Sequence, residues 1–113
     1  MKICIHRGTK QIGGTCIEIE ADGKRLVLDI GLPLDSDWKD VALPPVKGFI
    51  EKDSDLLGIA ISHPHQDHYG LAKKILQDIP VLIGADARKI LDAARKFFPE
   101  TVKFICTGFC IST

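Results

Sequence analysis

The chain has 113 residues, of which 45% are hydrophobic and 27% charged. This composition is typical of a globular domain, or part of one, and excludes an intrinsically disordered chain. Fifteen basic and fifteen acidic residues give a formal net charge of zero, so no global field attracts nucleic acid or an anionic membrane. No apolar run approaches the roughly 20 residues of a membrane span. The cysteines are few and scattered, so we expect them to be reduced, in a cytoplasmic protein.

The first part of the chain predicts three strands. Lys2–His6 is a short apolar run, and Thr15–Glu20 alternates between apolar and polar residues. The turn signal Asp22-Gly23 then predicts a hairpin with the next strand, Lys24–Asp29. That strand has three consecutive apolar residues, so we expect it to be covered on both faces.

Residues Leu34–Asp55 show no periodicity and contain Pro44-Pro45, which predicts a long loop. Loops of this length within a compact domain are usually functional or mobile. Two interpretations stay open: a lid over a reactive centre with Trp38 as its large aromatic residue, or a surface excursion in which Trp38 is partly buried.

The second part of the chain alternates strands and helices. We expect, in order, strand Leu56–Ser62, helix Tyr69–Asp78, strand Val81–Gly84, helix Ala85–Phe98, and short strands at Val102–Cys106 and Phe109–Ser112. The buried face of the second helix is expected to comprise Ala87, Ile90, Leu91, Ala94, Phe97 and Phe98. This order predicts an α/β protein with a mixed sheet and helices on one face, or half of a larger layered fold.

The stretch SHPHQDHYG, from Ser62 to Gly70, holds three of the four histidines of the chain. His63 and His65 are two residues apart, so in an extended segment their imidazoles project in parallel to one side. Asp67 and His68 follow where the chain turns toward a helix, and are expected to address a second cation nearby.

Imidazole and carboxylate groups together suit zinc, manganese or iron, and do not distinguish strongly among them. Two such ions about 3.5–4 Å apart can share a water molecule, lower its pKa and bind the attacked group. Asp67 is the candidate catalytic residue, because a carboxylate beside that water can bind metal and also orient the water or accept its proton.

The run His63-x-His65-x-Asp67-His68 resembles the signature of the metallo-β-lactamase superfamily of binuclear metallohydrolases. Residues Ile12–Asp35 are similar to the opening hairpin and third strand of that family. Within the superfamily, the sequence of the chain most resembles the ribonuclease J and β-CASP branch. The resemblance implies an αβ/βα sandwich. It also implies that Asp29, in Asp29-Ile30-Gly31, hydrogen-bonds the ligand loop and orients the metal ligands from outside their coordination sphere. The alternative for Asp29 is an ordinary turn aspartate at a strand end.

The same resemblance indicates an incomplete site. Family members add further ligands from a second half of the domain, and no histidine follows His68 in this chain. Cys106 and Cys110 are expected to be ordinary core cysteines. We therefore interpret residues 1–113 as a single, truncated domain, the first half of the sandwich. Its uncovered apolar sheet face should favour a homodimer or association with a complementary C-terminal half.

Two functional hypotheses follow from the sequence. In the first, the protein is a metal-dependent hydrolase with two zinc ions per complete site. It would use metal-activated water on an ester or phosphodiester, RNA being one candidate substrate. In the second, it is a catalytically inactive fragment or split subunit that serves as a metal-binding or interaction module. Whether the isolated chain is an enzyme stays open at this point.

Overall fold

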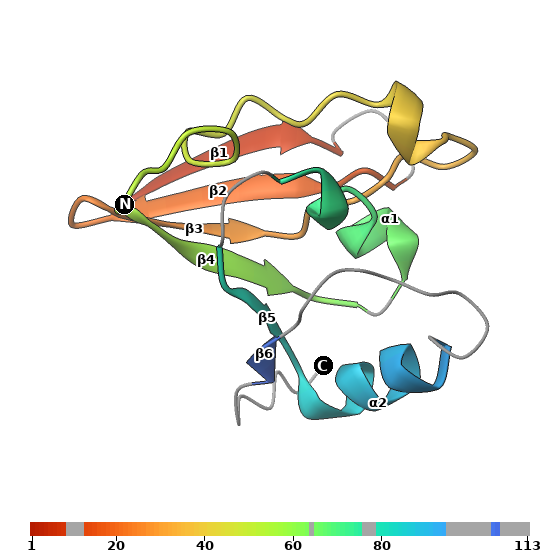
Figure 1. Cartoon of the computed structure of the whole chain (residues 1–113). Helices are drawn as coiled ribbons and strands as arrows, with labels where there is room; N and C mark the ends of the chain where they lie inside the picture. The colour runs from red at the N-terminus through yellow and green to blue at the C-terminus, as the bar shows by residue number, and fades with distance from the viewer. Residues whose placement is uncertain (9–12, 64, 76–78, 95–104, 107–113) are drawn as a thin grey trace.

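A computed structural model describes residues 1–8, 13–63, 65–75, 79–94 and 105–106. These residues form a six-stranded sheet in the order β1-β2-β3-β4-β5-β6. The strands are β1 (Lys2–Arg7), β2 (Cys16–Ala21), β3 (Lys24–Leu28), β4 (Leu56–Ile61), β5 (Val81–Ile83) and β6 (Ile105–Cys106). The helices are α1 (Gln66–Tyr69) and α2 (Ala85–Ala94), with 3-10 turns η1 (Trp38–Asp40) and η2 (Ala72–Lys74). Strands β1 to β3 pair antiparallel and β3 to β6 parallel (Figure 1).

The mixed α/β class predicted from the sequence is confirmed, and this sheet with its helices corresponds to the first half of the expected sandwich. The hairpin between β2 and β3 is confirmed as well. Its turn residues Asp22 and Gly23 both have positive φ, 51° and 78°, as a two-residue type I′ turn requires. No helix among the described residues is long and apolar enough to cross a membrane.

The helix predicted at Tyr69–Asp78 is wrong over its described part. The chain forms the single turn α1, then η2, and Ile75 is already extended. The reason is a competing backbone interaction: Ile30 N donates to His68 O at 2.9 Å, and Leu71 N donates to Ile30 O at 3.1 Å. These bonds tie the segment to the chain beyond β3 instead of to its own next turn.

Helix α2 is confirmed as far as Ala94, but Ile90, assigned to its buried face, is 56% exposed. Residues 95–98 of that helix, the second of the two C-terminal strands, and the side chains of Trp38 and Cys106 lie outside what the structure describes. The loop between β3 and β4 is present, with η1 as a short helical turn, and its role as a lid stays a prediction.

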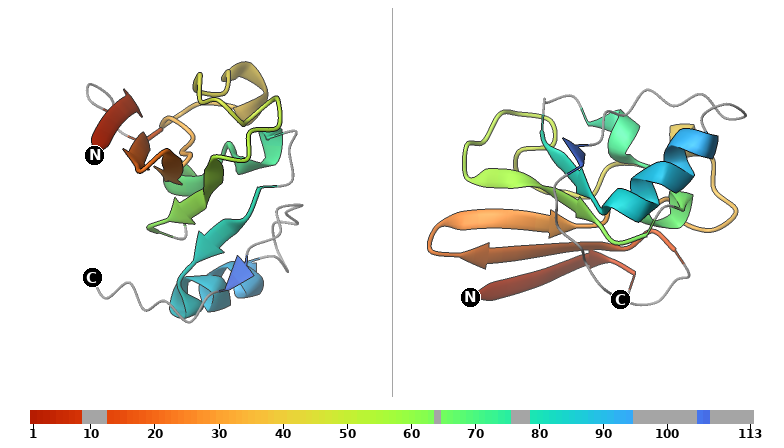
Figure 2. Two further views of the ribbon diagram at one scale, coloured as in Figure 1. Left: turned by 90° about the vertical axis from the view of Figure 1, so that its left-hand side faces the viewer. Right: turned by 90° about the horizontal axis from the view of Figure 1, so that it is seen from below.

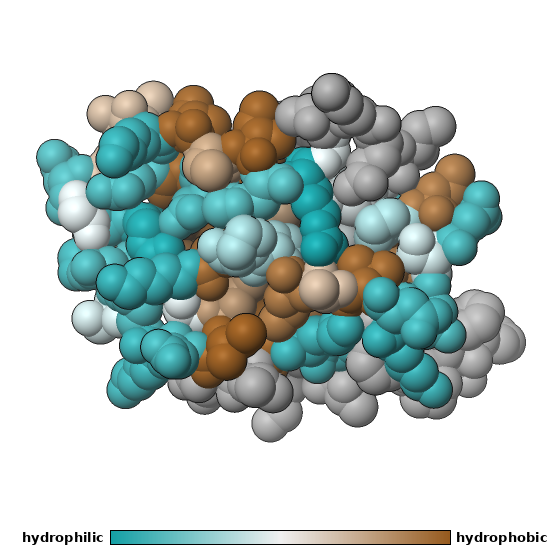
Figure 3. All heavy atoms as spheres, turned by 90° about the horizontal axis from the view of Figure 1, so that it is seen from above, coloured by the Kyte–Doolittle hydropathy of each residue, from teal (hydrophilic) through white to brown (hydrophobic). Residues whose placement is uncertain are grey.

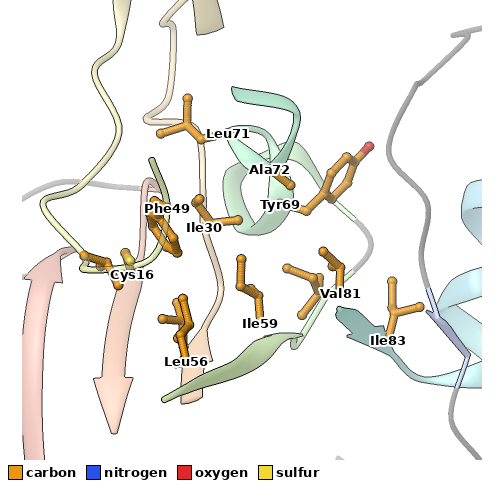
Figure 4. Close-up of a cluster of buried hydrophobic side chains, with 13 residues drawn as sticks. Cys16, Ile30, Phe49, Leu56, Ile59, Tyr69, Leu71, Ala72, Val81 and Ile83 are labelled. Atoms are coloured by element: carbon orange, nitrogen blue, oxygen red, sulfur yellow. The ribbon is translucent and has the colours of Figure 1, made fainter. Parts of the chain in front are cut away.

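The core lies between one face of the sheet and the segments that cross it. Figure 4 shows Phe49 from the long loop, and Tyr69 and Leu71 from the segment after the histidines, around Ile30 and Ile59. Strands β2 to β5, the long loop and the segment after the histidines all supply apolar side chains to one cluster, which fixes the loop and that segment against the sheet. The surface that faces the viewer when the molecule is seen from above is mainly hydrophilic, with smaller hydrophobic patches (Figure 3).

The opposite face of the sheet is apolar but less covered. Cross-strand pairs form one row from Ile3 to Ile19 and Leu26, and a second through Ile5, Ile17, Leu28, Ala60 and Leu82. Ile3 and Ile5 are 61% and 53% exposed. The two further views in Figure 2 show how the sheet twists from β1 to β6, with α2 beside β5. Association through this face stays a prediction.

A buried arginine near the start of β3 contacts acidic side chains of β2 and of the long loop. Arg25 Nη1 donates to Glu18 Oε2 at 2.7 Å, and its Nη2 lies 3.1 Å from Asp53 Oδ2. Burial by itself raises the pKa of the Glu18 carboxyl, but hydrogen bonds from Arg25 and His6 outweigh it and lower that pKa below its usual value. This cluster joins the hairpin to the end of the long loop.

The lowered pKa of Glu18 predicts that the free energy of unfolding depends on pH. Its stabilisation is fully present above the ordinary pKa of 4.5 and is lost as the pH falls through the lower folded-state pKa. We expect Glu18→Gln to be less stable than wild type at pH 7, and the difference to shrink as the pH approaches 3. Urea unfolding between pH 7 and pH 3 measures this, with the exposed Glu51→Gln as control. A constant difference across that range would contradict the assignment.

Candidate functional site

Two parallel strands deliver the candidate site to one edge of the sheet. Strands β3 and β4 pair in parallel, with Leu28 opposite Ala60. Asp29 directly follows β3, and Ser62 and His63 directly follow β4. The carboxyl ends of parallel strands meet at one edge, where such sheets commonly place functional groups.

Asp29 is the point to which the histidine loop is tied. Its carboxyl accepts hydrogen bonds from Ser62 N at 2.7 Å and from Ser62 Oγ at 2.6 Å, and its Oδ2 lies 3.0 Å from His68 Nδ1. The residue is 5% exposed and has a φ of 60°, a left-handed conformation that aspartate tolerates better than most residues. A buried carboxylate with these partners is satisfied, and it orients both strand ends.

The contact with Asp29 also selects a tautomer of His68. An ionised carboxylate only accepts hydrogen bonds, so His68 Nδ1 must carry the proton that it shares with Asp29. In the neutral ring the lone pair then lies on Nε2. The atom that faces Nε2 is Asp67 Oδ2, at 3.3 Å.

The backbone of the loop is fixed as closely as its side chains. Asp67 O accepts from Gly14 N at 3.2 Å, in addition to the bonds between Ile30 and the segment after Asp67. A Cβ at Gly31 would lie 1.8 Å from this same Asp67 carbonyl oxygen. Gly31 is therefore required because the loop backbone passes directly over it.

The three imidazoles of the loop lie close together. The ring centroids of His63 and His65 are 4.6 Å apart, and those of His63 and His68 are 5.2 Å apart. The planes of these two ring pairs are inclined by 64° and 54°. Strand β4 ends at Ile61, before His63, and His65 O already accepts from His68 N as the chain turns into α1. The projection of His63 and His65 to one side, toward a shared cation, stays a prediction.

The structure therefore brings together the predicted residues His63, His65, Asp67 and His68. Within the described part of the chain, no three histidine, cysteine, aspartate or glutamate side chains are spaced to hold one metal ion. The donor chemistry fits such an ion: exposed imidazoles, a half-exposed carboxylate and one ring nitrogen with a free lone pair. The roles of these four residues as metal ligands stay a prediction.

Ser62 is a residue of the candidate site that sequence reasoning misses. Its backbone and hydroxyl groups both bond to Asp29, and its Oγ lies 3.3 Å from His68 Nδ1. The signal for it is positional: a small hydroxyl residue ends a buried strand beside the strand that ends in aspartate. Periodicity alone does not reveal which strands are neighbours.

Gly31→Ala tests whether the loop depends on this close approach. We expect a loss of about 1–3 kcal/mol or more in the free energy of unfolding, because backbone atoms must move. The matched control is Gly23→Ala, where the φ of 78° is strained but no atom lies within 4 Å of the new Cβ. Only Gly31→Ala should shift the NMR signals of the three loop imidazoles. Equal unfolding losses, with unchanged imidazole signals in both variants, would refute the contact.

No protein-family model matches the chain. Curated relatives do match it: the probable RNase MJ4 of Methanocaldococcus jannaschii is 28% identical over 99 residues, covering 85% of this chain and 22% of that protein. Ribonuclease J of Synechocystis is 33% identical over 89 residues, covering 74% of this chain and 14% of that protein. Ribonuclease J of Mycoplasma genitalium is 30% identical over 86 residues, covering 72% and 15%.

A solved structure shares the fold. A protein of unknown function from Enterococcus faecalis V583 superposes with a TM-score of 0.70 at 20% identity, over 94% of this chain and 33% of that one. The chain thus spans about a third of that structure and between 14% and 22% of the curated relatives named above. Taken with the histidine motif, these matches make the chain a homologue of the ribonuclease J group of the metallo-β-lactamase superfamily, aligned with part of the length of those proteins.

Proposed function

We propose that the chain carries the ligand loop of a binuclear, metal-dependent nuclease that hydrolyses phosphodiesters, with RNA as the substrate class. The observation that best supports a metal site is the close approach of His68 Nε2 and Asp67 Oδ2. Both are acceptors when Nδ1 bonds to Asp29, yet they face each other at 3.3 Å. Such a pair needs positive charge, from a second ring proton or from a cation.

In this proposal each loop residue has a distinct role. His63 and His65 hold a first ion, and Asp67 and His68 hold a second, with zinc preferred and manganese or iron as alternatives. When bound, such ions supply Lewis-acid activation of water and of the attacked phosphoryl group. Asp67, whose side chain is 39% exposed, orients the water and accepts its proton. Asp29 and Ser62 hold His68 in the tautomer whose Nε2 can bind a cation.

The substrate class rests on the relatives. Two relatives, which match 85% and 74% of this chain, have names that say they are ribonucleases. The chain itself has a formal net charge of zero, so recognition of RNA would depend on local groups or on additional polypeptide.

Completion of the site is the second part of the proposal. A catalytic zinc normally has three protein ligands, whereas the loop supplies two for each ion. We propose that a complementary C-terminal half, or a second copy of the chain, supplies the others. The apolar rows opposite the core are the surface on which such a layer would pack. The other candidate function is an inactive metal-binding or interaction module.

His65→Ala separates these functions. We expect wild type to retain zinc or manganese in equilibrium dialysis, and the variant to bind at least about tenfold more weakly, because one ligand of the first ion is gone. The control is Asp86→Asn, an exposed carboxylate on α2. Hydrolysis of bis(p-nitrophenyl) phosphate is then measured with the same proteins and added metal.

The outcomes distinguish the hypotheses clearly. Hydrolysis by wild type and Asp86→Asn that disappears in His65→Ala supports the enzyme. Metal binding that depends on His65, with equal background hydrolysis in all three proteins, supports the module. Equal metal retention by wild type and His65→Ala would contradict the metal site itself.

A further inference from the structure

A second group of reactive side chains lies at the edge of the sheet, three strands from the one that leads into the histidine loop. Cys4 and His6 are on β1, which has β2 on one side within the described sheet. Cys4 pairs directly with Glu18 of β2, so the two side chains project from the same face. His6 is two residues from Cys4 and projects from that face as well.

These three residues form a connected chain of contacts. His6 Nε2 lies 2.8 Å from Glu18 Oε1, and Arg25 Nη1 donates to the other oxygen of Glu18 at 2.7 Å. A carboxylate accepts, so Nε2 carries the proton and the neutral ring presents its lone pair at Nδ1. Cys4 Sγ lies 4.0 Å from this Nδ1, at the long end of the range for a sulfur hydrogen bond.

Burial differs along this chain of contacts. The side chains of His6, Glu18 and Arg25 are only 11%, 15% and 10% exposed, so the ring and its carboxylate partner are held in one orientation. Cys4 is exposed. A fixed base therefore stands behind a sulfur that solvent molecules can reach, which is the arrangement that activates a cysteine nucleophile.

We propose that Cys4 is a base-assisted reactive thiol, with His6 as its proton acceptor and Glu18 as the residue that positions the ring. The class of reactant is a small, soft electrophile, with low-molecular-weight disulfides as the natural example. The thiol proton passes to His6 Nδ1, and Cys4 sulfur forms a bond to one sulfur of the disulfide. The other sulfur leaves with the electron pair of the broken S–S bond and takes up that proton, so Cys4 is oxidised and the departing thiol reduced.

The chain contains an internal reference for this reaction. Cys16 is fully buried, and burial raises the pKa of its thiol to about 12. It should be inert in the folded protein, because both access and thiolate formation are suppressed. Its reactivity also reports unfolding independently of Cys4.

The test is the rate of modification at each cysteine, followed by peptide mass spectrometry with iodoacetamide and with oxidised glutathione at pH 7. In folded wild type we expect Cys4 to react at least about tenfold faster than the same cysteine in the urea-denatured chain, with Cys16 protected. His6→Ala should lower the Cys4 rate severalfold while Cys16 stays protected, and Glu18→Gln should lower it less.

Two results would overturn the proposal. One is a Cys4 rate in the folded protein no higher than in the denatured chain. The other is a His6→Ala variant, with Cys16 still protected, that modifies Cys4 at the wild-type rate. If exposure of Cys16 shows that the variant has unfolded, the comparison of folded and denatured wild type decides alone. None of these readouts involves a metal ion or hydrolysis.

Discussion

The carboxylate of Asp29 is the interaction on which the candidate site depends. It lies where β3 ends, and it binds the first residue after β4 and the last histidine of the loop. A buried carboxylate without partners would be costly, so burial of Asp29 and the conformation of the loop are linked. Two strand ends, one loop and the tautomer of one imidazole are thereby set by a single side chain.

The surrounding packing makes this interaction possible. The backbone of Asp67 passes over Gly31 with no room for a side chain, and the segment after it is paired to Ile30. Tyr69 and Leu71 then enter the core beside Phe49 (Figure 4). The loop is therefore held by polar contacts to the chain around Asp29 and by apolar contacts in the core, while His63 and His65 remain exposed. That combination suits residues that must bind something from solvent while keeping a defined position.

The sequence predicts those parts of the fold whose signals are local. The hairpin at Asp22-Gly23 and strand β4 follow from turn chemistry and apolar runs. The helix expected from Tyr69 onward fails because its apolar spacing is satisfied by packing against the chain beyond β3, a long-range contact that periodicity does not contain. The four loop residues predicted as metal ligands are neighbours in sequence, and their role as ligands stays a prediction. Ser62 and the Cys4–His6–Glu18 group were missed because their partners lie on other strands.

The most direct test of this account is the tautomer of His68, measured by two-bond 1H–15N NMR of the imidazoles in the metal-free protein at neutral pH. The account predicts that His68 Nδ1 carries a proton, and predicts that Asp29→Asn removes this preference while the sheet stays folded. A ring protonated at Nε2 alone, or a wild-type pattern unchanged in Asp29→Asn, would contradict it, because Asp29 would then not be orienting the loop.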